Sequence, residues 1–264
     1  MKQFTGLVVS LTLPVAYAFG GEAPMLKKMV DAGKLPPLEE RLPENPLVEN
    51  PVTEVGEYGG KLVLGTAFFL DDERLPSRVD RNGFFQFSYP FPAEGPIKPN
   101  LAESWNWNSD GTKLTINMRK GIKWSDGKPF TTEDVIFFMD DIVNDKDVAY
   151  IWFYESNFYD AEGNFPKITK IDDHTLEFEY DATAFLFEKK YANVVWQALP
   201  KHHFKTWHPK YNSKSSYEIL NEKLKILGVD SEGGRVTLNA WVVDEYVPDG
   251  KLHMTRNPYY WKVD

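Results

Sequence analysis

Five carboxylates crowd one short stretch of the sequence, around a glycine turn and an aromatic run. They are Asp126, Glu133, Asp134, Asp140 and Asp141, all within RKGIKWSDGKPFTTEDVIFFMDDI at 119–142. Carboxylates at close quarters are suited to general acid–base chemistry or to holding a divalent cation. The first question is whether this cluster performs chemistry or only starts an element of the fold.

The spacing of these acids favours architecture. Thr131 is followed three residues later by Asp134, so we expect a capping box at the start of a helix. Glu133 would face the positive end of that helix dipole. Asp140 and Asp141 are expected on a solvated helix face, the usual place of a charge pair. The sequence therefore predicts a structural role for the cluster.

Other chemical motifs are incomplete. The stretch 121–128 resembles a phosphate loop, but its glycines are one residue too far apart and Pro129 replaces the Ser or Thr. No G-x-S-x-G elbow and no EF-hand pattern occur. His202, His203 and His208 lack an H-E-x-x-H or comparable carboxylate pattern, so we expect a surface turn and no metal. A glycosidase pair among the 39 acidic residues stays open.

Composition narrows the classes of protein. The chain has 264 residues, enough for one large or two small domains, and 42% of them are hydrophobic. Its net charge of −9 argues against a nucleic-acid partner. Without cysteine it has no disulfide, thiolate metal site or cysteine nucleophile. Aromatic residues make up 15%, which fits either core packing or a surface that stacks on ligands.

The first 18 residues have the pattern of a secretory signal. Lys2 precedes an apolar run from Phe4 to Val15, and Ala16-Tyr17-Ala18 is a small-x-small cleavage site. We expect cleavage after Ala18 and a periplasmic or extracellular protein; a buried first helix is the alternative. The remaining sequence has no stretch apolar and long enough to cross a bilayer.

The following segment, 19–58, is predicted to be a short helix and a proline-rich extended arm. Met25, Leu26, Met29 and Val30 share one helical face, and Gly33 ends it. Five prolines between 36 and 51 argue against helix and central strand in the arm. KLVLGTAFF at 61–69 then predicts a largely buried first strand.

Strands and helices alternate in the rest of the chain, which predicts an α/β, mixed α+β class. Two hairpins are expected, one turning at 110–111 with Leu114, Ile116 and Met118 inward, and one turning at 172–173 with Leu176, Phe178 and Tyr180 inward. Ile122 and Trp124 are expected to finish a strand, followed by a turn at 125–127. Helices are predicted at 131–144, 182–193 and 215–227, the last with a capping box at Ser215-x-x-Glu218 and an apolar row of Leu220, Leu224 and Leu227.

The order of these pieces resembles a known family. PNLAESWNWNSDGTKLTINMRKGIKWSDGKPFTTEDVIFFMDDI, ITKIDDHTLEFEYDATAFLF, ALPKHHF and LHMTRNPYYWKVD follow one another as in the family 5 extracellular solute-binding proteins, the peptide- and oligosaccharide-binding components of ABC importers. The segment 24–62 resembles the N-terminal extension of a longer-chain subgroup. In the family the last motif lies well inside the chain, so the sequence resembles an N-terminal portion. Uncovered aromatics at Tyr259, Tyr260 and Trp261 would agree with that.

The resemblance implies a periplasmic-binding-protein-like type II fold, first lobe only, with 59–264 forming most of that lobe and the second lobe missing. It implies a monomer without cofactor or catalysis that captures an oligopeptide or oligosaccharide and delivers it to a membrane permease. A secreted carbohydrate-active enzyme is the alternative, and a fragment that has lost binding with its second lobe is a third.

Candidate ligand contacts follow from position. Thr66, Phe68 and Phe69 come after the expected first strand, where open sheets present ligand-facing loops. Trp241 lies where the resemblance places a segment near the cleft and hinge. Tyr89 and Trp152 are further candidates. For each aromatic residue, burial in the core is an equally good expectation.

Overall fold

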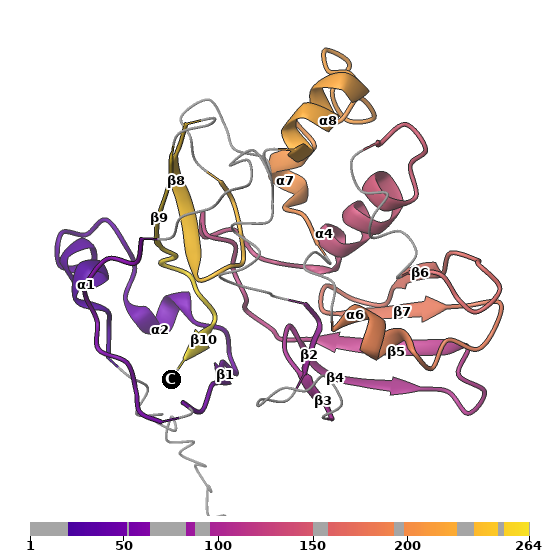
Figure 1. The fold of residues 1–264 in the computed structure, drawn as a ribbon, viewed down its shortest axis with the longest axis horizontal. Helices are drawn as coiled ribbons and strands as arrows, with labels where there is room; N and C mark the ends of the chain where they lie inside the picture. Colours follow the sequence, from indigo (N-terminus) through magenta and orange to yellow (C-terminus); the bar gives the residue numbers. More distant parts are fainter. Residues whose placement is uncertain are drawn as a thin grey trace, which may run out of the picture.

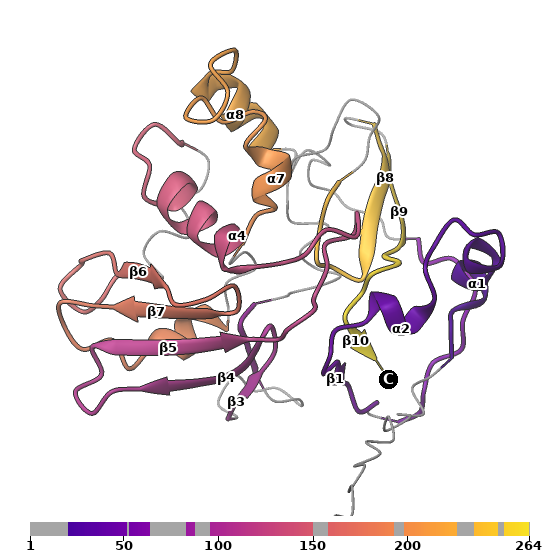
Figure 2. The same cartoon turned by 180° about the vertical axis from the view of Figure 1, so that it is seen from behind.

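The computed structural model describes residues 21–51, 53–63, 83–87, 96–149, 158–192, 198–225, 235–247 and 251–263. A four-stranded antiparallel sheet and the helices beside it form one end of the molecule, and α1 (Pro24–Asp31) and α2 (Leu38–Arg41) lie at the other end (Figures 1 and 2). Across the described ranges no helix combines the length and the apolar character that a membrane crossing needs.

Both predicted hairpins are confirmed, and they join into the main sheet. Strands β4 (Ala102–Trp107) and β5 (Lys113–Met118) pair with β7 (Thr175–Glu179) and β6 (Lys167–Lys170) in the order β4-β5-β7-β6. Alternation puts apolar side chains on one face, and all six predicted inward positions are buried: Leu114, Ile116, Met118, Leu176, Phe178 and Tyr180. On β5 and β7 the polar partners form the other face, where Lys113 pairs with Glu177 at 3.1 Å.

Helices cover the apolar face. In α6 (Phe187–Tyr191), Phe187 packs on Phe178 at a ring distance of 5.5 Å and stacks on Tyr191 at 4.1 Å. This helix is much shorter than the predicted 182–193. The last predicted helix is α8 (Tyr217–Lys225), in which Leu220 and Leu224 are fully buried; position 227 lies outside the described residues.

The helix predicted at 131–144 has two parts. It begins as α4 (Thr132–Ile136) and continues as a π-helix, η1 (Phe137–Val143), in which Asn144 N–H donates to the carbonyl of Met139 five residues back. Val135, Phe138, Met139 and Ile142 are buried as predicted. The prediction that Asp141 is solvated is wrong: it is 7% exposed because the segment at 208–211 covers it, while Asp140 is exposed.

The N-terminal arm is fastened to the last strand of the chain. Strand β1 (Leu47–Val48) pairs in parallel with β10 (Lys262–Val263), and Lys262 Nζ lies 2.9 Å from Glu49. The buried guanidinium of Arg41 donates to the carbonyls of Pro36 and Pro258 and to Glu22. The arm is therefore extended as predicted except at α2, a single turn that follows the prolines at 36–37.

Two short antiparallel pairs complete the architecture. One is β2 (Phe85–Phe87) with β3 (Ile97–Pro99), and the other is β8 (Trp241–Val247) with β9 (Lys251–Arg256). The segment after β9 returns to the core, where Trp261 is fully buried and Tyr260 packs beside it. Tyr259 lies over the 125–127 turn, within 2.9 Å of where a Cβ on Gly127 would stand. The expectation of three uncovered aromatics is therefore wrong.

Three further local predictions differ from the structure. Residues 61–63 are not in a strand, and Leu62 and Val63 are 75% and 76% exposed, whereas 64–69 lie outside the described residues. Ile122 and Trp124 are buried but follow the end of β5, joined only by a bridge between Lys123 and Pro129.

The predicted capping box at Ser215 is also wrong. Ser216 accepts from Ile219 N–H at 3.3 Å at the start of α8, while the Ser215 hydroxyl donates to the carbonyl of Trp207. The cap therefore lies one residue later than the spacing of Ser215 and Glu218 suggested.

Candidate functional site

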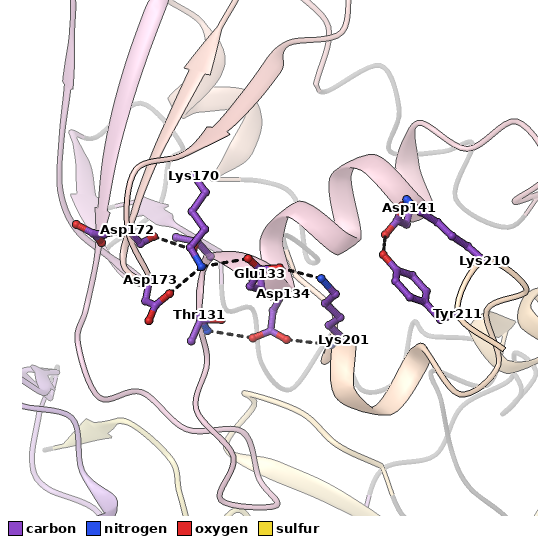
Figure 3. Close-up of polar contacts among 11 residues, drawn as sticks. Thr131, Glu133, Asp134, Asp141, Lys170, Asp172, Asp173, Lys201, Lys210 and Tyr211 are labelled. Carbon is purple, nitrogen blue, oxygen red and sulfur yellow. Dashed lines mark hydrogen bonds and ion pairs between the residues drawn. The ribbon is translucent and has the colours of Figure 1, made fainter.

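The acid cluster converges on Asp134, which caps two helices at once. Its carboxylate accepts from Thr131 N–H at 3.0 Å before α4, and from Lys201 N–H at 2.9 Å at the start of α7 (Lys201–Phe204) (Figure 3). The indole N–H of Trp124 donates to the same carboxylate at 3.2 Å. The predicted capping box at Thr131 is confirmed. The link to α7 was not visible in the sequence, since 67 residues separate the partners.

Glu133, next to Asp134, forms ion pairs with two lysines. Its two oxygens lie 2.8 Å from Lys201 Nζ and 3.1 Å from Lys170 Nζ, and Lys170 also pairs with Asp173 at 2.7 Å (Figure 3). Hydrogen bonds from Lys201 and then Lys170 lower the pKa of Glu133 below its ordinary value. Thr132 ties the same helix start to the β6–β7 turn, donating from its hydroxyl to the carbonyl of Asp172 at 2.8 Å.

The chemistry of the cluster is that of a structural anchor. Burial raises the pKa of Asp134, and the backbone N–H groups of Thr131 and Lys201 act against that rise. The three protein donors to the carboxylate come from Trp124, Thr131 and Lys201. The carboxylate therefore joins α4, α7 and the 124–131 segment. In the part of the chain that the structure describes, no group of three or more His, Asp or Glu side chains could hold a metal ion.

The three histidines make different contacts. His208 is fully buried; its Nδ1 accepts from Lys210 N–H at 3.1 Å, so its Nε2 carries the proton donated to the carbonyl of Asp141 at 2.9 Å. His202 pairs with Asp126 at 2.8 Å, and His203 packs edge-on against Trp207 at 4.6 Å. The expectation of a surface turn is wrong for His208.

Of the six predicted ligand contacts, only Trp241 lies within the described residues. Thr66, Phe68, Phe69, Tyr89 and Trp152 all fall outside the described ranges. Trp241 is the first residue of β8 and is 39% exposed. Its side chain is therefore available to a ligand, although exposure alone does not assign it a role.

The backbone around Trp241 is held from two sides. Before it, Thr237 N–H donates to Ser125 Oγ at 3.0 Å, and Ser125 N–H donates to the Thr237 carbonyl at 2.9 Å. Behind it, Asn257 donates from its backbone to the Ala240 carbonyl at 2.7 Å and from its side chain to the Asn239 carbonyl at 2.8 Å. These hydrogen bonds fix the backbone from which the indole of Trp241 projects.

Two residues that the sequence did not single out, Arg256 and Tyr58, lie close to each other at this end of the hairpin. The strand register places Arg256 directly opposite Trp241, so both side chains are on the same face of the hairpin. The guanidinium carbon of Arg256 lies 5.2 Å from the ring centre of Tyr58, a residue of the N-terminal arm that is 43% exposed. Counting outward from the turn would have paired Trp241 with Asn257, because the irregularity between Val243 and Glu245 shifts the register by one residue. The sequence carries no signal that would bring Tyr58 to it.

Comparison with known proteins identifies the family. The family model of bacterial extracellular solute-binding proteins, family 5, matches residues 96–264. The periplasmic alpha-galactoside-binding protein of Rhizobium meliloti (strain 1021) is 34% identical over 260 residues, which cover 90% of this chain and 36% of that protein.

Solved structures agree. The oligopeptide-binding protein OppA superposes with a TM-score of 0.75 at 30% identity, covering 91% of this chain and 38% of that one. The periplasmic binding protein MelB from Agrobacterium fabrum C58, in complex with stachyose, gives a TM-score of 0.64 at 29% identity, covering 92% and 38%.

The mixed α/β, type II periplasmic-binding-protein fold is thereby confirmed, and the chain spans little more than a third of the length of the proteins it matches. The resemblance first seen in the order of four sequence motifs is matched by a family model over more than half of the chain and by structures over nine-tenths of it. This chain belongs to the bacterial extracellular solute-binding proteins, family 5.

Proposed function

We propose that this chain is part of the substrate-binding component of an ABC importer, which captures an oligosaccharide outside the cytoplasm and delivers it to a membrane permease. The observation that carries the choice of ligand is that an alpha-galactoside-binding protein and a stachyose complex match 90% and 92% of the chain. A second candidate ligand class is oligopeptides, because OppA superposes over 91% of the chain with a TM-score of 0.75.

The proposal includes the route and the mode of action. Residues 1–18 act as a secretory signal cleaved after Ala18, 19–58 form an arm, and 59–264 belong to the first lobe of a monomeric two-lobed clamp. Such a clamp closes on its solute, and the closed form is what the permease recognises. The protein catalyses nothing and needs no cofactor in this scheme.

Binding to the protein at its full natural length tests the proposal. Stachyose and trialanine are titrated separately by calorimetry, and thermal unfolding is followed with each. A solute at a hundredfold excess over its Kd stabilises the folded state by about 2.7 kcal/mol, so a rise in Tm accompanies true binding. Tight binding of stachyose supports the sugar, and binding of trialanine alone supports the peptide.

Two results would contradict the proposal. Neither solute binding at millimolar concentration would remove both ligand classes tested. Steady release of galactose from stachyose, followed as free reducing sugar over hours, would instead favour the alternative of a secreted carbohydrate-active enzyme.

A further inference from the structure

We propose that Trp241 and Arg256, with Tyr58 behind them, form a sugar subsite on the β8–β9 hairpin, here called the hairpin subsite. Trp241 would stack on the apolar face of a sugar ring, and Arg256 would donate to adjacent hydroxyl oxygens of that sugar. Tyr58 is a positioning residue that holds the guanidinium plane. The assignment rests on the proposed function and specifies where one part of the oligosaccharide is held.

The geometry of the hairpin brings the two ligand-facing groups together. Trp241 and Arg256 are register partners in an antiparallel pair, which places their Cβ atoms about 5 Å apart on one face. Trp241 is 39% exposed and Arg256 is half-buried, so both side chains retain surface that solvent can reach. The hydrogen bonds of Asn257 to Ala240 and Asn239 fix the backbones of both strand ends. A sugar on the indole face would therefore have its hydroxyls near the guanidinium.

The charges of the hairpin single out Arg256. On the other face Glu245 pairs with Lys251 at 2.8 Å, and at the strand irregularity Asp244 pairs with His253 at 2.6 Å. Within the ranges that the structure describes, Arg256 has no ion pair with a carboxylate, and its guanidinium carbon lies 5.2 Å from the ring centre of Tyr58. This is unexpected in a chain with 39 acidic and 30 basic residues. An arginine left without an acid retains its planar set of N–H donors for a ligand.

Tyr58 leaves those donors usable. The ring centre of Tyr58 lies 5.2 Å from the guanidinium carbon, and among the described residues no hydrogen bond uses the five N–H groups of the Arg256 side chain. The edge of a guanidinium matches two neighbouring oxygen acceptors, which a sugar supplies as vicinal hydroxyls. A neutral sugar also approaches a chain of net charge −9 without the repulsion that an anion would meet. An exposed indole beside a donor fork is thus better suited to a saccharide than to an anionic solute.

The test compares variants of the full-length protein by calorimetry with stachyose. Arg256→Gln removes the charge and the fork, and we expect binding weakened by about tenfold or more. Arg256→Lys keeps a cation but loses the planar fork, so most of the loss should remain. Trp241→Ala should weaken binding by about tenfold. Lys251→Gln is the matched control, because it removes a cation from the other face of the same hairpin and should leave the Kd within about twofold.

The outcomes separate this inference from the function on which it rests. Wild-type binding of stachyose with unchanged affinity in Arg256→Gln and Trp241→Ala would overturn the hairpin subsite and leave the function standing. Absence of stachyose binding in the wild type would overturn both the hairpin subsite and the choice of an oligosaccharide as the ligand.

A second titration, with a peptide, tests whether Arg256 binds a carboxylate instead of a sugar. If the wild type binds trialanine, and Arg256→Gln weakens that binding but not binding of trialanine amide, the residue binds a carboxylate and the sugar assignment is wrong. Thermal unfolding of each variant shows that it is folded, and Arg256→Lys keeps the test valid if Arg256→Gln does not fold.

Discussion

Two regions of this protein hold polar groups close together, and they use them in opposite ways. Around Asp134 three donors of the protein share the carboxylate, and the neighbouring Glu133 is paired with two lysines. At the hairpin subsite, Arg256 lies near the ring of Tyr58 and has no carboxylate partner among the residues described. The carboxylates that suggest chemistry in the sequence have partners within the protein. The pair at 241 and 256, which forms no known motif, has polar groups left for a ligand. Satisfaction of hydrogen bonds separates architecture from recognition more sharply than residue type does.

The largest expected effect on stability comes from removing the carboxylate of Asp134. Asp134→Ala removes the acceptor for Thr131 N–H, Lys201 N–H and the indole of Trp124, all beside a carboxylate that is 4% exposed. Buried donors without acceptors are costly, so we expect a loss of about 3–4 kcal/mol in the free energy of unfolding. Urea denaturation followed by tryptophan fluorescence measures it.

Its control lies on the same helix. Asp140 is exposed, and Asp140→Ala should change the free energy of unfolding by less than about 0.5 kcal/mol. If the two variants were equally stable, Asp134 would not be the anchor of α4 and α7, and the contrast between the two regions would be lost.

Local patterns predicted the parts of the fold that local physics decides. Alternation of apolar residues gave both hairpins and all six inward positions of β5, β7 and Tyr180, because period-two burial is fixed by strand geometry. The Thr131 cap was predictable for the same reason, since its partner is three residues away. The placement of Asp141 was not, because what covers it is a segment 67 or more residues later.

The candidate site shows the same division. Trp241 could be proposed from its place in the sequence, and Arg256 follows once the hairpin register is known. Tyr58 is 198 residues from Arg256 in sequence, and no spacing rule connects an exposed tyrosine in a proline-rich arm to the end of β9. Contacts of this kind depend on tertiary packing of the arm, which the fastening of Arg41 and β1 to residues 258–263 provides.

A smaller effect is expected from replacing Tyr58, which lies near Arg256 at the hairpin subsite. Tyr58→Leu removes the ring over Arg256, and a cation–π contact at an exposed site contributes about 0.5–1 kcal/mol. We therefore expect a loss of about 0.5 kcal/mol in unfolding free energy, and a stachyose affinity weakened by about threefold because the guanidinium is no longer held. Calorimetry and urea denaturation on the same preparation measure both.

Tyr58→Phe is the matched variant. It keeps the ring and loses only the long hydroxyl contact to the carbonyl of Gly21 at 3.4 Å, so both quantities should stay near wild type. Equal losses in the Leu and Phe variants would mean that the hydroxyl, not the ring, supports Arg256.

The smallest expected effect concerns Asp126 and His202, which stand between the two regions. Burial would raise the pKa of Asp126, but its hydrogen bonds with His202 and the Lys128 N–H prevail and lower the pKa below the ordinary value of 3.8. An acid with a lowered pKa in the folded state adds stability at pH values above 3.8, and that stability is lost as pH falls below 3.8. Because the pair is partly exposed, Asp126→Asn should cost only about 0.5 kcal/mol at pH 7. Urea denaturation of both proteins from pH 7 to pH 3 should show this difference in stability shrinking only below pH 3.8. A difference that stays constant across the range would show that the charge of Asp126 contributes nothing. The turn at 125–127 would then be held by its hydrogen bonds to Thr237 and by the backbone hydrogen bond within the turn.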